Sequence, residues 1–367
     1  MISRVAVGLM QEGVTTAIAT PRSLGDPESA GLTTHVAYDD LGWQVTLKSR
    51  AAGLLTLLAS EEYAGWAGGG SEGGTIDVIH AWGHAAWPMA VELARETDSA
   101  VVLDVWSMGA AEQIRRTERS AARGREEAVR GVWLAPSRGL LSQTEPRAHL
   151  WPCQMLHWGV HAPEKIPAFE KKAQWSIGVV CSGEMPEATI AMLQGIAQVA
   201  PSYPEMLVFL DEAGVANDHR VWRAAQEAGL LDRLSVIADM ESRRELVLRT
   251  DLLLLPDVAG ETRSIILDAM AHGVVVIADA STSSDAIIDG RTAMTVGGRG
   301  AEHWARAIRN VLDDEDTHAA IRKEAHRLIL TERRGHVHVS ALMRVYEGLT
   351  TGEPIAFRAA GPPHSSR

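Results

Sequence analysis

The segment 257–264, in the last third of the chain, holds the side chains best suited to chemistry in that region. Glu261 supplies a carboxylate, Arg263 a guanidinium group, and Thr262 and Ser264 supply hydroxyls. The planar fork of an arginine suits phosphate oxygens, so this mixture predicts a polar loop that binds an anion. A second interpretation stays open for Glu261, because a carboxylate near the start of a helix also stabilises the helix dipole.

The sequence on both sides of this loop predicts the elements that position it. Residues 252–255 and 274–278 are apolar runs of the kind found in buried parallel strands. Residues 264–271 have helical apolar spacing, and Gly273 marks the end of that helix. In such a strand–loop–helix–strand unit the loop lies at the carboxyl edge of the sheet. The free amides and the dipole of the helix favour phosphate there.

The composition bounds the class of protein. The chain has 367 residues, enough for two domains, and its 46% apolar and 22% charged residues are typical of a soluble globular protein. No apolar run approaches the ~18 residues of a membrane span. The net charge of −12 argues against general nucleic-acid binding. Cys153 and Cys181 imply no disulfide framework and fit inert thiols in a reducing cytoplasm.

Strand-like apolar runs alternate with helix-like segments along the whole chain, which predicts an α/β fold with two doubly wound domains. The predicted strands are 14–20, 78–81, 101–105, 175–181, 206–210, 234–238, 252–255 and 274–278. The predicted helices are 3–13, 88–97, 124–130, 186–199, 219–229, 243–249, 264–272, 301–313, 317–332 and 336–349.

Four parts are expected along the chain. Residues 1–163 form an N-terminal domain and residues 164–335 a C-terminal domain, divided near a polar, proline-bearing stretch. Residues 336–349 form a helix that packs back on the N-terminal domain, and residues 350–367 form a disordered tail. The chain opens in a helix, whereas a doubly wound domain usually opens with a strand. We therefore expect the first N-terminal strand to be missing, or the true start to lie upstream.

The stretch "LLLLPDVAGETRSIILDAMAHGVVVIADASTSSDAIIDGRTAMTV", residues 252–296, resembles the donor-binding segment of retaining GT-B glycosyltransferases of the group 1 type (family 4). The positions that match the pattern of that family are Pro256, Leu267, Ala269, Met270, Ala271, Gly273, Val276, Asp289, Gly290 and Thr292. Weaker similarity extends over about residues 4–350. The resemblance implies two Rossmann-like domains that face each other across a cleft.

The resemblance also implies roles for individual residues. The family transfers a sugar from a nucleotide-sugar with retention and without a bound metal. Asp268 stands where the family binds the ribose, and Glu261 is next to the position that touches the transferred sugar. Arg263 and the amides of 262–264, with the turn at Gly183, are expected to hold the diphosphate. Glu261 and Arg263 are therefore the catalytic candidates.

Several positions depart from the family pattern. The first Glu of the motif falls at Gly260, and the phosphate-binding Arg and Lys fall at Gly183 and Ala188. A His at a strand end aligns with Trp106. Because one such electrostatic donor is typically worth roughly 3–4 kcal/mol in a transition state, their loss leaves two functions open. One is a hexosyltransferase. The other is a catalytically silent homologue that acts as a binding or scaffolding partner.

The N-terminal half places five ring side chains at the ends of two predicted strands: His80, Trp82, His84, Trp87 and Trp106. They are expected to form an aromatic platform for the acceptor, because Trp offers a flat face and one hydrogen-bond donor. The alternative is that the Trp side chains fill the interior of a chain with only three Phe. His80 and His84 are not expected to bind a metal, because no Cys, Asp or Glu accompanies them at ligand spacing.

The expected partners follow from the resemblance. The co-substrate is a UDP- or GDP-sugar, with no bound cofactor or metal, and the acceptor is a carbohydrate or a lipid. No nucleic acid is expected. Such a protein belongs to cytoplasmic carbohydrate biosynthesis, while peripheral membrane contact and the oligomeric state stay open.

Overall fold

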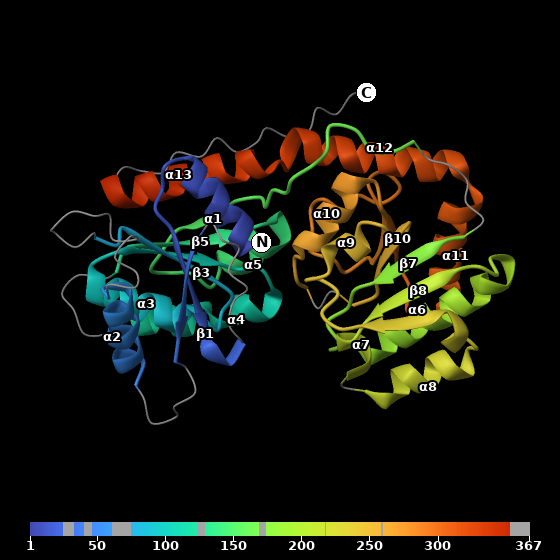
Figure 1. Cartoon of the computed structure of the whole chain (residues 1–367), viewed down its shortest axis with the longest axis horizontal. Coiled ribbons are helices and arrows are strands. Elements are labelled where there is room, and N and C mark those ends of the chain that lie inside the picture. Colours follow the sequence, from blue (N-terminus) through green and yellow to red (C-terminus); the bar gives the residue numbers. More distant parts are fainter. Residues whose placement is uncertain are drawn as a thin grey trace.

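The computed structural model of the chain describes residues 1–24, 33–39, 46–60, 75–122, 129–168, 174–216, 218–257 and 260–352. They form two α/β domains that lie side by side, and the long helices α12 (Glu315–Glu332) and α13 (Gly335–Thr351) run along one edge of both (Figure 1). The predicted two-domain α/β layout is confirmed. The helix predicted at 124–130 and the tail beyond residue 352 fall wholly or largely outside the described residues.

The N-terminal domain contains a four-stranded parallel sheet with the order β3-β4-β5-β6. Its strands are β3 (Val78–Trp82), β4 (Ala100–Asp104), β5 (Gly131–Ala135) and β6 (Cys153–Met155). A two-stranded parallel sheet of the same domain consists of β1 (Ala17–Pro21) and β2 (Thr34–Tyr38). Every residue of β4 and β5 is buried, which fits their nearly unbroken apolar sequences.

The helices of this domain are α1 (Ile2–Gln11), α2 (Leu47–Leu58), α3 (Trp87–Thr97), α4 (Met108–Ala121) and α5 (Arg138–Thr144). The elements β2, β6, α2, α4 and α5 were not predicted from the sequence. The side chains that α4 buries are mainly small or polar, so its apolar stripe is weak. Serine caps define its start instead, because Ser107 accepts a hydrogen bond from the amide of Ala110. Ser137 caps α5 in the same way.

The C-terminal domain contains a six-stranded parallel sheet with the order β12-β11-β10-β7-β8-β9. Its strands are β7 (Ser176–Val179), β8 (Leu207–Asp211), β9 (Leu234–Ile237), β10 (Leu252–Leu255), β11 (Val275–Asp279) and β12 (Met294–Val296). Its helices are α6 (Pro186–Val199), α7 (Ala213–Ala216), α8 (His219–Glu227), α9 (Arg244–Val247), α10 (Ser264–His272), α11 (Ala301–Asp313) and α12. The short strand β12 was not predicted from the sequence.

The order of the strands reverses between β7 and β10, which pair in parallel. From β7 the chain adds β8 and β9 on one side, and it then returns to add β10, β11 and β12 on the other. Ligands of open α/β sheets bind at such a switch point, outside the carboxyl ends of the strands. The loops that follow β7 and β10 flank this point, and α10 begins beside it.

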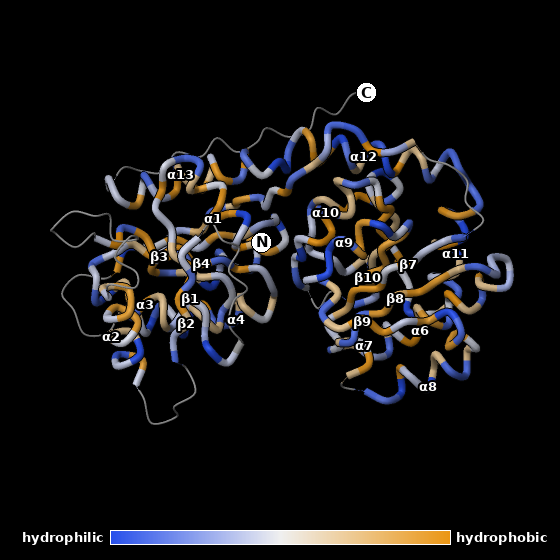
Figure 2. The backbone as a smooth tube through the Cα atoms, viewed as in Figure 1, coloured by the Kyte–Doolittle hydropathy of each residue, from blue (hydrophilic) through white to orange (hydrophobic). Residues whose placement is uncertain are grey.

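Both faces of the C-terminal sheet are covered. Leu252 and Leu254 of β10 pack in the cluster formed with α6 and α11, whereas Leu253 and Leu255 pack in the cluster formed with α10. Figure 2 shows hydrophobic residues along these strands and many hydrophilic ones on α8 and α12. Four consecutive leucines therefore form one strand that is buried on both faces.

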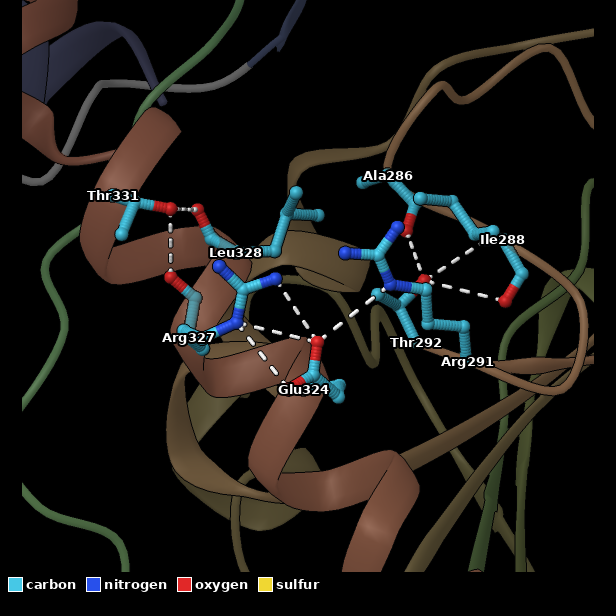
Figure 3. Close-up of polar contacts among 8 residues, drawn as sticks. All are labelled: Ala286, Ile288, Arg291, Thr292, Glu324, Arg327, Leu328 and Thr331. Atoms are coloured by element: carbon cyan, nitrogen blue, oxygen red, sulfur yellow. Dashed lines mark hydrogen bonds and ion pairs between the residues drawn. The ribbon is translucent and has the colours of Figure 1, made fainter. Parts of the chain in front are cut away.

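The turn that carries the matched Asp289, Gly290 and Thr292 is closed by side-chain contacts (Figure 3). Thr292 is buried, and its hydroxyl donates to the carbonyl of Ala286 at 2.6 Å. On α12, Glu324 pairs with Arg327 at 2.9 Å and lies 3.6 Å from Arg291. The matches at Asp289, Gly290 and Thr292 therefore lie in a turn that these side-chain contacts stabilise.

Helix α13 covers the N-terminal domain. Val339, Leu342 and Val345 pack in one cluster with Val5 of α1 and Val102 of β4. The two segments that connect the domains meet where the amide of Val160 donates to the carbonyl of Arg333 at 2.8 Å. The amide of Gly335 donates to the carbonyl of Val160 at 2.9 Å. No helix within the part of the chain that the structure describes is long and apolar enough to cross a membrane.

Candidate functional site at the start of helix α10

Helix α10 begins at the domain interface. The amide of Thr262 donates to the carbonyl of Trp106 at 2.8 Å, which joins the loop before α10 to the loop after β4. Met108 packs against Gly260, whose φ of +69° is in the region that favours glycine. Ser264 and Ile265 are the first residues of α10, so their amides have no acceptor within the helix. The start of α10 therefore combines a free helix terminus with a contact from the other domain.

Asp268, one turn into α10, is paired with two arginines. Both terminal nitrogens of Arg4, from α1 of the N-terminal domain, donate to the two carboxylate oxygens at 2.7 and 2.8 Å. Arg244, from α9, also forms an ion pair with Asp268, and its Nη2 donates to the hydroxyl of Ser264 at 2.8 Å. Burial, and next the charge of Arg4, lowers the pKa of Arg244 to about 10, so it stays charged at neutral pH. The carboxylate itself is only 5% exposed.

Arg263 is held between two carboxylates. Its Nη1 lies 3.2 Å from Glu241, and its Nη2 lies 2.9 Å from Glu261. Burial is the main reason that the pKa of Glu261 is raised, and nearby Glu184 and Glu241 raise it further, against the effect of Arg263. Around the start of α10, three arginines and three carboxylates thus form mutual pairs.

The loop after β7 is closed by a carboxylate from the loop after β10. Gly183 has a φ of +76°, which allows the turn. Asp257 is 2% exposed and accepts hydrogen bonds from the hydroxyl of Ser182 and, at 3.0 Å, from the amide of Met185. The amide of Glu184 donates to the Ser182 hydroxyl at 3.0 Å. Asp257 therefore already accepts the hydrogen bond of a main-chain amide, that of Met185, beside the switch point.

The ring side chains of the N-terminal domain are split between core and surface. His80 stacks on Trp82 with ring centres 4.7 Å apart, and its two ring nitrogens contact Asp104 and the Tyr346 hydroxyl of α13. His84 is exposed. Trp106 is 41% exposed at the interface. Of the predicted platform, Trp106 contacts the loop before α10, through its main-chain carbonyl.

Two surface hollows of about 460 and 470 Å³ lie away from this site. One is lined by residues near β12 and α11, including Gly290 and Asp313. The other is lined by residues at the amino edge of the C-terminal sheet, including Ser176 and Thr250. The start of α10 is a better candidate site than either hollow, because the paired charged groups and the switch point of the sheet are there. Among the described residues, no three His, Cys, Asp or Glu side chains are placed to bind one metal ion.

The structure brings together Thr262 and Trp106, and it brings Ser264 and Asp268 together with two arginines that the sequence analysis missed. Arg4 lies 264 positions from Asp268 in the sequence, so no local pattern pointed to that pair. Arg244 lies in a run of charged residues at the start of the short helix α9, and this run was the available signal. Asp257 was also missed, although it directly follows the Pro that ends the apolar run.

Comparisons with known proteins agree with this architecture. Residues 173–314 match the family model described as "Glycosyl transferases group 1". Sucrose-phosphate synthase from Thermosynechococcus elongatus superposes with a TM-score of 0.73 at 14% identity, over 96% of this chain and 93% of that one. HepE of Anabaena, in complex with UDP and glucose, gives 0.70 at 12% identity over 95% and 96%.

WaaG, a glycosyltransferase involved in lipopolysaccharide biosynthesis, gives a TM-score of 0.61 at 15% identity over 95% of both chains. No curated protein matches the sequence. The predicted GT-B fold and the predicted resemblance to group 1 glycosyltransferases are confirmed, at low sequence identity. The segment that matches the family model contains α10 and both loops at the switch point.

Proposed function

We propose that this chain transfers a glycosyl group, of the hexosyl type, from a nucleotide-sugar to an acceptor with retention of the anomeric configuration. One observation carries the proposal. The start of α10 lies at the switch point of the C-terminal sheet, inside the segment that matches group 1 glycosyltransferases, and the N-terminal domain contacts it through Trp106. The donor then binds at α10, and the acceptor approaches from the Trp106 side.

Each residue has a role in this proposal. Asp268 binds the ribose hydroxyls, and Glu261 binds hydroxyls of the transferred sugar. Arg263 and the main-chain amides of 262–264 hold the diphosphate, next to the turn at Gly183. The Thr262 amide must leave the Trp106 carbonyl before it can bind phosphate, because it donates there now.

The physical reason for this arrangement is the charge that develops on the leaving group. As the glycosidic bond breaks, the nucleoside diphosphate gains negative charge, and preorganised amides and a guanidinium group aimed at it lower the barrier. Glu261 is close enough to Arg263 to hold its side chain in place, with 2.9 Å between the charged atoms. The UDP bound to HepE supports a uridine nucleotide as the first donor to try.

The acceptor side of the proposal concerns a carbohydrate or a lipid-linked sugar. The main-chain carbonyl of Trp106 contacts the loop before α10, and its exposed indole lies against Gly83. Met108 adds an exposed apolar surface against Gly260. Sugar rings stack on such faces, because the indole is flat and the stacked sugar can keep its hydroxyl groups in water. Trp82 and the exposed His84 complete the predicted acceptor side, with His80 behind them.

Nucleotide binding followed by turnover tests the function. Thermal unfolding with UDP, GDP, UDP-glucose and GDP-mannose should reveal a stabilising ligand, since a ligand at 100 times its Kd adds about 2.7 kcal/mol. Asp268→Ala should remove the shift, while Arg306→Ala, an exposed residue of α11, should keep it. Release of UDP or GDP from the matching sugar nucleotide then reports activity. Absence of binding to every nucleotide would falsify the proposal.

A catalytically silent homologue is the second candidate, and the paired charges favour it. Asp268 is held by two arginines, Arg263 by two carboxylates, and the Met185 amide by Asp257. A donor must break several of these contacts to bind. Absence of binding to any nucleotide would favour this candidate over the transferase, and so would nucleotide binding without release of nucleotide from any sugar donor, with or without simple glycoside acceptors.

A further inference from the structure

Arg4 joins the two domains at the centre of the candidate site. It belongs to α1 of the N-terminal domain, and it forms a forked pair of hydrogen bonds, 2.7 and 2.8 Å long, to Asp268 of the C-terminal domain. The Asp268 side chain is 5% exposed and that of Arg4 is 35% exposed. Such two-point pairing of a guanidinium group with a buried carboxylate is among the stronger polar contacts in proteins.

The geometry of the pair leaves few acceptor positions free on Asp268. A carboxylate offers about four lone-pair sites. Arg4 takes one on each oxygen, and Arg244 pairs with Oδ2 as well. The two neighbouring hydroxyls of a ribose would also donate one hydrogen bond to each carboxylate oxygen of Asp268. A forked guanidinium group and a ribose diol are therefore alternative ligands of the same carboxylate edge.

We propose that Arg4 and the ribose of the donor compete for Asp268, so that Arg4 determines the affinity and the ribose selectivity of the donor site. This inference rests on the proposed function, which assigns the ribose to Asp268. Donor binding exchanges one forked pair of hydrogen bonds for another and releases Arg4 toward solvent, to which it is already partly exposed. Arg244 stays in place, because Ser264 also holds it.

Competition of this kind weakens binding by the fraction of molecules in which the site is open. If the Arg4–Asp268 pair is open in about one molecule in ten, the apparent Kd is about tenfold weaker than that of the open site. Removal of the Arg4 guanidinium should recover this factor. A residue that helped to bind the nucleotide would have the opposite effect.

Isothermal titration with UDP, GDP and their 2′-deoxy forms tests the competition. Arg4→Ala should bind UDP or GDP about tenfold more tightly than the unchanged protein. The gain should be smaller for the 2′-deoxy nucleotides, because they present only one of the two hydroxyls. Arg4→Lys, which keeps the charge but not the fork, should show an intermediate gain, and Arg306→Ala should show none.

A second readout does not depend on these variants. Addition of UDP to the unchanged protein should accelerate hydrogen exchange in α1, because the helix loses its contact with α10. Folding of Arg4→Ala is checked by circular dichroism, and Arg4→Lys with the exchange data decides the matter if Arg4→Ala does not fold.

The outcomes separate this inference from the function on which it rests. Equal nucleotide affinity with and without the Arg4 guanidinium overturns the competition and leaves the donor site intact. Weaker binding by Arg4→Ala also overturns it, since Arg4 then acts as a ligand of the nucleotide. Failure of every variant to bind UDP or GDP overturns the donor site itself and the inference with it.

Discussion

Two buried carboxylates, Glu118 in the N-terminal domain and Asp268 in the C-terminal domain, have different kinds of hydrogen-bond partner. Both residues are about 5% exposed or less. Glu118, on α4, accepts hydrogen bonds from the Trp133 indole at 2.9 Å and from the amides of His149 and Trp151 at 2.8 and 3.3 Å. Asp268 is paired with the long side chains of Arg4 and Arg244.

The two carboxylates differ in whether a ligand could replace their hydrogen-bond partners. The donors to Glu118 all belong to one domain, and two of them are main-chain amides, so no ligand can replace them without unfolding that domain. The partners of Asp268 are long side chains, one from each domain, and one of them can turn to solvent. Equal burial therefore accompanies a structural role at Glu118 and a replaceable contact at Asp268. Four measurements test this contrast.

The largest effect is expected for Glu118→Ala. The change leaves the Trp133 indole and two amides buried without an acceptor, so the free energy of unfolding should fall by about 3–5 kcal/mol. Urea unfolding at neutral pH, followed by circular dichroism, measures the loss. Glu118→Gln keeps one acceptor oxygen and should lose about half as much. If the free energy of unfolding of the alanine variant fell by less than about 1 kcal/mol, Glu118 would have no structural role of this kind.

Asp268→Ala should cost less, about 1–2 kcal/mol. It leaves Arg4 and Arg244 without their carboxylate, but Arg4 is 35% exposed and can turn to water. The loss should shrink further in 0.5 M NaCl, because salt weakens the ion pairs of the unchanged protein. The cost at Glu118 should not respond to salt in this way. Equal responses at the two positions would contradict the contrast drawn above.

Glu261 should make a smaller, pH-dependent contribution. Burial raises its pKa above the ordinary 4.5, so the folded protein holds this proton more tightly than the unfolded chain does. Ionised Glu261 therefore destabilises the fold, and that cost appears as the pH rises from about 4.5 through the raised pKa. Glu261→Gln should match the unchanged protein in stability at pH 4 and exceed it at pH 7, by less than the change expected for Asp268→Ala. Parallel urea titrations at the two pH values decide this.

The smallest effect concerns the two thiols. Burial, followed by the charges of Glu145 and Glu118, raises the pKa of Cys153 to about 12. Burial and the charge of Asp211 raise the pKa of Cys181 to about 12 as well. At pH 8 only about one thiol in 10⁴ is then ionised, so neither should react with a disulfide reagent within minutes in the folded protein.

Both thiols should react at once in urea, which serves as the control. Glu118→Gln should speed the reaction of Cys153 and leave that of Cys181 unchanged, because Glu118 contributes only to the pKa of Cys153. Rapid reaction of both thiols in the folded, unchanged protein would contradict the assigned burial of these groups.

The fold was largely predictable from the sequence, because the information that it requires is local. The apolar run of β10 and the Gly273 that ends α10 are each visible in a few consecutive residues, and both are found as expected. The missed elements carry weak local signals. Helix α4 buries alanines and a glutamate, and β12 has three residues. Their places are fixed by packing against elements that lie elsewhere in the chain.

The candidate site was predictable only in part for the same reason. The loop before α10 follows from the pattern around it. The partners of Asp268 do not, because Arg4 comes from the other domain and Arg244 from a different strand–helix unit. The closure of the loop after β7 by Asp257 also depends on strand order, which places residues 75 positions apart side by side. Charges that meet across a sheet edge leave no periodic trace in the sequence.

The meeting of the two connecting segments at Val160 has a mechanical consequence. Because Val160 is bonded to the carbonyl of Arg333 and to the amide of Gly335, both passages of the chain between the domains form a single narrow strap. Gly159 lies so close to the carbonyl of Arg334 that a larger side chain there would force the two passages apart. A protease that cuts one passage should therefore leave the halves tethered. Because both passages cross at one place, any rotation of one domain relative to the other has to occur about this strap.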